Sequence, residues 1–146
     1  MEKKQFSVAL SYLEEVASVM EDSPEYLCDK GTCLLKVGRV EEGLRLIEQA
    51  LKVNPRVKYG EPYLRVAEAY AKLAQMEKAL ASLEELAKMN MSSCEVYYKQ
   101  GELYAELNQK EKAKQSYREA VEVYRVLPPY KRRLERRWAL LAWLKK

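Results

Sequence analysis

The sequence repeats itself with a period of 34 residues, and this feature limits the possible folds more than any other. The aligned windows are 24–57, 60–93 and 94–127, and only Lys58 and Tyr59 stand between the first two. The eighth residue of each window is small: Gly31, Ala67 and Gly101. The eleventh is large: Leu34, Tyr70 and Tyr104. A period of this length indicates a repeat protein, in which each repeat is one supersecondary unit that packs on its neighbours.

Each window contains two stretches in which apolar residues recur at helical spacing. In the second window the stretches are Tyr63, Val66, Ala67 and Tyr70, then Ala79, Leu83 and Leu86. Recurrence after three and four residues places such side chains on one face of a helix. Small residues at the eighth and twentieth positions let two helices approach closely. We therefore predict an all-α chain of helix–turn–helix pairs, with Gly38 in a turn and Pro55 ending a helix.

The three windows resemble the tetratricopeptide repeat. The matching residues at positions 20, 24 and 27 are Gly43, Ile47 and Ala50, then Ala79, Leu83 and Leu86, then Ala113, Tyr117 and Ala120. The Trp that the family often has at position 4 is absent, and Gly43 and Leu86 stand where the family has Ala. The resemblance implies a right-handed α-solenoid of helix–turn–helix repeats with about eight helices.

We expect a single domain over residues 1–146, because this length suits one domain. Residues 1–23 continue the frame backwards, with Ala9, Leu13 and Val16 at positions of a second helix. They are expected to form an N-terminal half-repeat or cap, unless the chain is cut from a longer array. Residues 128–146 begin with two prolines and are expected to form a basic capping helix over the last repeat.

The composition excludes most kinds of chemistry. The chain has no histidine and no Gly-rich phosphate loop, so we expect no catalytic residue, no cofactor and no metal site. A thiol activity at Cys28 would need a histidine or a cation to lower its pKa. Cys28, Cys33 and Cys94 are instead expected to be structural. Free thiols without a secretion signal favour a cytoplasmic location, and no apolar stretch is long enough to span a bilayer.

The resemblance also implies a binding groove, because the first helix of each repeat in this family lines a concave surface through positions 2, 5, 9, 12 and 13. The corresponding residues are Glu25, Cys28, Thr32, Leu35 and Lys36; Glu61, Leu64, Glu68, Ala71 and Lys72; and Glu95, Tyr98, Glu102, Ala105 and Glu106. This set holds six glutamates and an apolar strip formed by Cys28, Leu35, Leu64 and Tyr98. Cys28 is the one cysteine expected to be accessible. A glutamate at position 2 also favours any helix N-terminus, so Glu68, Glu102 and Glu106 are the more informative ones.

We interpret the chain as a non-catalytic scaffold for protein–protein interaction. A partner peptide or helix, preferably basic or neutral, would lie in the acidic and apolar groove. The alternative is a homo-oligomerising or membrane-surface assembly module that acts through the C-terminal helix. Nucleic acid is a poor candidate partner, because an acidic groove repels phosphate.

The C-terminal helix has a composition that suits contact as well as capping. Seven of the 26 basic residues lie in residues 128–146, against Glu135 as the single acidic one. On a helical wheel Leu134, Trp138 and Leu141 share the face expected to pack on the repeats. Trp143 falls on the opposite side, together with Ala139. The residues expected to make a self-contact or partner contact, with a membrane surface as the lesser option, are Trp143, Arg133, Arg136 and Arg137.

Overall fold

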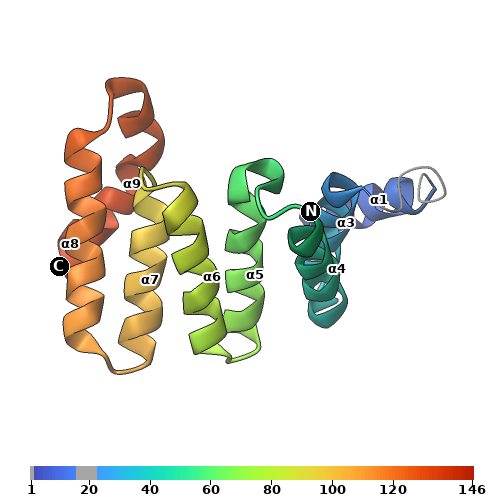
Figure 1. The fold of residues 1–146 in the computed structure, drawn as a ribbon, viewed down its shortest axis with the longest axis horizontal. Coiled ribbons are helices and arrows are strands. Elements are labelled where there is room, and N and C mark those ends of the chain that lie inside the picture. Colours follow the sequence, from blue (N-terminus) through green and yellow to red (C-terminus); the bar gives the residue numbers. More distant parts are fainter. Residues whose placement is uncertain (1, 16–22) are drawn as a thin grey trace. The chain divides into compact units, whose positions relative to one another are not determined.

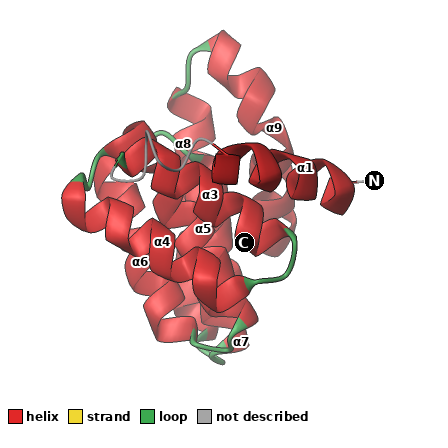
Figure 2. Cartoon of the chain, turned by 90° about the vertical axis from the view of Figure 1, so that its right-hand side faces the viewer, coloured by secondary structure: helices red, strands yellow, loops and turns green. Residues whose placement is uncertain are grey.

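A computed structural model describes residues 2–15 and 23–146 of the chain. Its elements are α1 (Glu2–Glu15), α3 (Pro24–Lys36), α4 (Val40–Val53), the 3-10 turn η1 (Val57–Gly60), α5 (Glu61–Lys72), α6 (Met76–Met89), α7 (Cys94–Glu106), α8 (Lys110–Val126) and α9 (Pro129–Lys145). Over the described residues the structure consists of helices and loops without strands (Figure 2). The predicted fold class, all-α with helix–turn–helix repeats, is confirmed. Val16 lies outside the described residues.

Two helices, α3 and α7, begin directly after a serine that caps their first turn. The hydroxyl of Ser23 accepts a hydrogen bond from the backbone N–H of Tyr26 at the start of α3, with 3.4 Å between N and Oγ. Ser93 makes the same contact to Val96 at the start of α7, also at 3.4 Å. Each serine thus satisfies one of the backbone donors that a first helical turn leaves without a partner.

The turn inside each repeat contains one residue with a left-handed backbone. This residue is Gly38 with φ +96°, Ala74 with φ +57° and Asn108 with φ +58°. All three occupy position 15 of their windows, so the turns share one geometry although their sequences differ. A left-handed backbone is free of strain for glycine and unfavourable for alanine.

The structure divides into two compact units, Met1–Leu73 and Ala74–Lys146. In the first unit α3 and α4 cross at Gly31 and Gly43. A Cβ on Gly31 would lie 2.8 Å from the carbonyl oxygen of Gly43, and one on Gly43 would lie 2.6 Å from the carbonyl oxygen of Gly31. These contacts confirm the predicted role of small residues at positions 8 and 20. α1 packs on α3 through Leu10 and Leu34, and the Tyr26 hydroxyl donates to the Leu13 carbonyl at 2.8 Å.

The second unit has the same kind of hairpin in α7 and α8. A Cβ on Gly101 would lie 2.4 Å from the ring of Tyr117, so glycine is what allows that ring to lie against α7. α9 packs on both α7 and α8 and contributes Ala139 and Ala142 to their core (Figure 1). The window 60–93 has α5 in the first unit and α6 in the second, and the prediction of a single domain stays a prediction.

Candidate partner-binding surfaces

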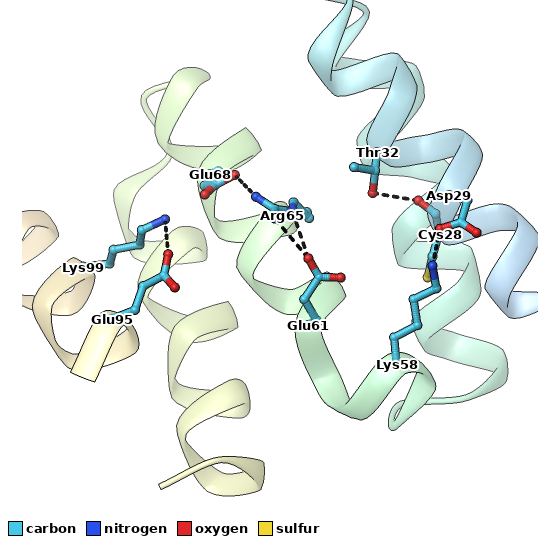
Figure 3. A network of polar contacts seen from close by, with 9 residues as sticks. All are labelled: Cys28, Asp29, Thr32, Lys58, Glu61, Arg65, Glu68, Glu95 and Lys99. Carbon is cyan, nitrogen blue, oxygen red and sulfur yellow. Dashed lines mark hydrogen bonds and ion pairs between the residues drawn. The ribbon is translucent and has the colours of Figure 1, made fainter. Parts of the chain in front are cut away.

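In the first unit, α5 presents a ladder of alternating charges. Arg65 forms ion pairs with Glu61, at 3.0 Å between Nη2 and Oε1, and with Glu68, at 3.1 Å between Nη1 and Oε2 (Figure 3). Burial alone would lower the pKa of Arg65, but the two carboxylates outweigh this effect and raise the pKa of the guanidinium above its ordinary value. The two glutamates were predicted from the sequence, whereas Arg65 was missed. The spacing of four and three residues to its acidic neighbours is the signal that could have found it.

A second polar contact joins the inserted residues to α3. Lys58 in η1 forms an ion pair and hydrogen bond with Asp29 on α3 (Figure 3). Thr32, a predicted groove residue, donates its hydroxyl proton to the carbonyl oxygen of Cys28 at 2.8 Å. Glu25 and Lys72 are exposed, and Thr32 and Lys36 are half-buried, so the polar part of the predicted set lies at the surface of this unit.

The predicted apolar strip is not open to a partner. Cys28, Leu35, Leu64 and Tyr98 are all buried, and Cys28 is only 2% exposed. Cys28 was expected to be the accessible thiol, and this expectation is wrong, because η1 and α5 pack against α3. Burial raises the pKa of Cys28 to about 11, which suppresses the reactive thiolate. All three cysteines are free and buried.

In the second unit, α9 contacts the predicted groove positions Tyr98 and Glu102 on α7, whereas Ala105 and Glu106 are exposed. The ring of Tyr98 lies between those of Trp138 and Tyr117, with centroid distances of 5.5 and 5.8 Å. Lys145 Nζ lies 2.6 Å from Glu102 Oε1 and 3.3 Å from the Tyr98 hydroxyl. Tyr98 and Glu102 therefore serve the docking of α9, which corrects their assignment to an open groove.

Glu102 is held in its ionised form by this contact. Burial would raise the pKa of Glu102, but hydrogen bonds from Lys145 and from the Tyr117 hydroxyl, the latter at 2.5 Å, lower it overall. Glu95, at the start of α7, pairs with Lys99 at 3.2 Å (Figure 3). Four of the six predicted groove glutamates thus have a basic partner within the chain: Glu61, Glu68, Glu95 and Glu102.

The face of α9 that packs on the core differs in part from the face predicted by the helical wheel. Trp138 and Leu141 pack on the core as predicted, and Trp143 is 54% exposed, also as predicted. Leu134, however, is 76% exposed, and Ala139 is buried in its place. The reason is steric: the small side chains of Ala139 and Ala142 allow α9 to approach its neighbours, and a leucine in the same contact would hold the helices apart.

A pocket of about 690 Å³ lies elsewhere in the second unit, among α6, α7 and α8. Tyr97, Tyr104 and Lys112 are among the residues that line it. Lys112 lies over the ring of Tyr104, with 5.6 Å between Nζ and the ring centroid. Burial raises the pKa of both tyrosines. The pocket was not predicted from the sequence, in which Tyr104 stands at a position of large residues in the repeat frame.

Residues 2–15 and 23–146, which the structure describes, contain neither a metal-binding cluster nor a membrane-spanning helix. No group of three or more His, Cys, Asp or Glu side chains is placed to hold a metal ion in that part of the chain. No helix within the same residues is both long enough and apolar enough to cross a bilayer.

Comparison with known proteins supports the repeat assignment. The family model for the tetratricopeptide repeat matches residues 60–90 and 95–126. No curated protein sequence matches the chain significantly.

Solved structures with the same fold are numerous. MamA from residue 41 to its end, from Desulfovibrio magneticus RS-1, is 26% identical with a TM-score of 0.72 and covers 81% of this chain. A MamA RS-1 ArsTM double mutant is 25% identical with a TM-score of 0.72 and the same coverage. The chain spans 66% and 65% of the length of these two MamA chains.

PcrH in complex with the chaperone-binding region of PopD is 17% identical, with a TM-score of 0.71 over 84% of this chain and 86% of that one. This likeness concerns the fold alone. The family model thus shows tetratricopeptide repeats at residues 60–90 and 95–126, and the helix–turn–helix pairs described above have the fold of these solved structures.

Proposed function

We propose that the chain is a non-catalytic scaffold that binds a segment of another protein, and that the open part of its binding surface is the α3–α5 face of the first unit. The observation that carries this proposal is a difference between the units. In the second unit α9 already contacts Tyr98 and Glu102, which leaves Glu106 as the one exposed charged groove position of α7, whereas the first unit exposes three such positions, Glu25, Glu61 and Lys72. The same fold holds a partner segment in PcrH, which was solved in complex with the chaperone-binding regions of PopD and PopB.

The chemistry of this face favours a partner with basic groups. The ladder of Glu61, Arg65 and Glu68 contains two carboxylates for one guanidinium, which leaves one net negative charge, and exposed Glu25 in the first turn of α3 adds another. Lys36 and Lys72 lie in the last turns of α3 and α5, so the negative charge belongs to the N-terminal part of these helices. Lysines or arginines of a partner segment would pair with these carboxylates in competition with Arg65. Because the apolar strip is buried, polar contacts would contribute more to recognition than apolar anchors. Exposed charges of this kind mainly increase the association rate, and salt screens them.

The proposal is tested by the binding of two synthetic peptides with identical apolar positions, one carrying lysines and the other glutamates. We expect the lysine peptide to bind more tightly at low salt, with the difference disappearing at high salt. Glu61→Gln with Glu68→Gln should reduce the association rate of the lysine peptide. Glu77→Gln with Glu111→Gln, which remove two exposed carboxylates from α6 and α8, should leave that rate unchanged. If the glutamate peptide binds as well as the lysine peptide at both salt concentrations, the proposed surface is wrong.

Capture of partners from a lysate with the parent and with the Glu61/Glu68 variant, followed by mass spectrometry, would then give the natural partner. Partners lost from the variant but kept by the α6/α8 control are those that use the α3–α5 face. The cytoplasmic location and the absence of catalysis stay predictions alongside this proposal.

A further inference from the structure

The outward side of α9 carries two chemically different zones, one after the other along the helix axis. The first half presents Arg133 and Arg137, and the second half presents Leu140 and Leu144, all four exposed. Spacings of four, three and four residues place these side chains on one stripe of the helix. The exposed ring of Trp143 enlarges the apolar zone. A helix that only caps a repeat array needs a polar outer face, so this apolar zone indicates a contact surface.

The outward side of α1 carries a stripe with the same spacing. Lys4, Val8, Ser11 and Glu15 follow one another at intervals of four, three and four residues, and all are exposed. The exposed ring of Tyr12 lies beside Ser11 in the sequence. The inward side of α1, with Leu10 at its centre, packs on α3. The stripe is therefore basic at its first end, partly apolar in its middle and acidic at its last end.

We propose that α9 of one copy of the chain packs antiparallel on α1 of a second copy. In this arrangement Arg133 meets Glu15, and Val8 meets Leu140. Leu144 receives the aliphatic stem of Lys4, whose ammonium group then lies near the C-terminal end of α9, where the helix dipole favours a cation.

The charges select this orientation over a parallel one. A parallel arrangement would put Lys4 against Arg133 and Glu15 against Leu144, which opposes like charges at one end and buries a carboxylate against leucine at the other. Arg137, whose guanidinium lies over the Trp138 ring with 5.2 Å between Cζ and the centroid, is also brought near Tyr12 in the antiparallel arrangement. An antiparallel pair matches the hairpin that α3 and α4 form within one repeat. In the 34-residue frame, α1 has the register of a second helix and α9 that of a first.

The contact joins two different surfaces, and this has a consequence for assembly. If α9 of one copy packed on α9 of another, Arg133 would meet Leu144 of the second copy in an antiparallel arrangement and Arg133 of the second copy in a parallel one. Neither contact is favourable. Each copy therefore uses one α1 surface and one α9 surface, so association does not stop at two copies unless the assembly closes into a ring. The average mass of the protein should accordingly rise with concentration.

Variants that block one surface at a time provide the test. Arg133→Glu blocks α9 and leaves α1 intact, and Glu15→Arg does the reverse. By sedimentation equilibrium the parent should pass beyond the mass of two chains, and each variant alone should stay a single chain, with association weakened at least tenfold. An equimolar mixture of the two variants should again pass beyond the mass of two chains, because both kinds of α1–α9 contact between them join opposite charges, the native pair in one and the reversed pair in the other. Recovery in the mixture also demonstrates that both variants are folded.

Two further samples complete the design. A chain with Arg133→Glu and Glu15→Arg together carries the reversed pair and should recover self-association. Arg118→Glu and Glu41→Arg, at exposed positions on α8 and α4, are the matched charge reversals and should assemble like the parent.

Several results would overturn the proposal. A parent that stays a single chain at every concentration contradicts it, and so does a mixture of the two variants that fails to associate. Association of Arg133→Glu alone would indicate an α1–α1 contact, and association of Glu15→Arg alone an α9–α9 contact. Binding of the single-chain parent to phosphatidylserine-containing vesicles, lost in Arg133→Glu, would assign the α9 surface to lipid instead.

Discussion

The carboxylate of Glu135 on α9 accepts a hydrogen bond from the backbone N–H of Glu95 at the start of α7, with 3.2 Å between N and Oε2. The first turn of a helix has N–H groups without partners and a partial positive charge, and Glu135 supplies both an acceptor and a negative charge there. A side chain 40 residues further along the chain thus caps α7. This contact, with those of Tyr98 and Glu102, fixes α9 along the length of α7.

The first prediction concerns the pH dependence of this cap. Burial raises the pKa of Glu135, and the backbone N–H bonds offset only part of that shift. A carboxyl whose folded-state pKa is raised gives stability below its unfolded pKa, and that stability is lost as the pH rises through the folded value. Glu135→Gln keeps an acceptor oxygen but cannot ionise. The free energy of unfolding of this variant relative to the parent should therefore be highest near neutral pH and fall as the pH is lowered towards about 4.

Urea unfolding of both proteins across this pH range gives the measurement. Glu106→Gln, at an exposed position on α7, is the matched control for the loss of one carboxyl group. A relative stability of Glu135→Gln that does not change with pH would show that Glu135 has the same pKa in the folded and unfolded chain.

The second prediction concerns the left-handed turn residues. Ala74→Gly should raise the free energy of unfolding by about 0.5–1 kcal/mol, because relief of the left-handed strain exceeds the extra entropy that glycine has in the unfolded chain. Gly38→Ala should lower it by about 1 kcal/mol, although the structure leaves open space at that position. Urea midpoints of the two variants should therefore move in opposite directions. A shift in the same direction would mean that side-chain contacts, and not backbone conformation, decide these turns.

The third prediction separates the two tryptophans of α9. Trp138 packs on Tyr98, and Trp138→Ser should lower the free energy of unfolding by about 2 kcal/mol through lost burial. Trp143→Ser, at an exposed position, should change it by less than about 0.5 kcal/mol. The same denaturation curves provide the comparison. Equal destabilisation by both changes would place Trp143 in the core and reduce the exposed apolar zone of α9 to Leu140 and Leu144.

The fourth prediction concerns thiol reactivity. Burial raises the pKa of Cys28 to about 11 and, with the negative charge of Glu135 adding to the effect, that of Cys94 to about 12. Burial also raises the pKa of Cys33. Very little thiolate is present at neutral pH, so native protein should react slowly with a thiol reagent at all three sites and rapidly in urea. Fast labelling of one site in the native protein would reveal local opening around that cysteine.

The sequence predicted those contacts in which two helices approach so closely that only small residues fit. The close contact of Gly31 with Gly43 could be predicted, because small residues recur at the same positions of the repeat frame. The burial of Cys28 could not, since it depends on how η1 folds over α3. The rotation of α9 was mistaken because a helical wheel favours large residues such as Leu134 for the core, whereas close helix packing selected Ala139.

The candidate site was predicted in outline and corrected in detail. The family positions pointed to the glutamates of α5 but passed over Arg65, which lies between them and takes up part of their charge. Charge pairing within one helix follows from residue spacing and could have been anticipated. The ion pair of Glu102 with Lys145 could not be predicted, because the two residues are 43 positions apart in the sequence and meet only when α9 docks on α7.

The cap that Glu135 forms on α7 makes a single amide hydrogen informative. In the first turn of a helix the Glu95 N–H has no acceptor from its own helix, so its protection from exchange with deuterium depends on α9 staying in place. Amides in the middle of α7 and α8 exchange only when the whole unit opens. The exchange rate of the Glu95 amide therefore reports the detachment of α9 separately from global unfolding, and it gives the free energy with which the C-terminal helix is held on α7.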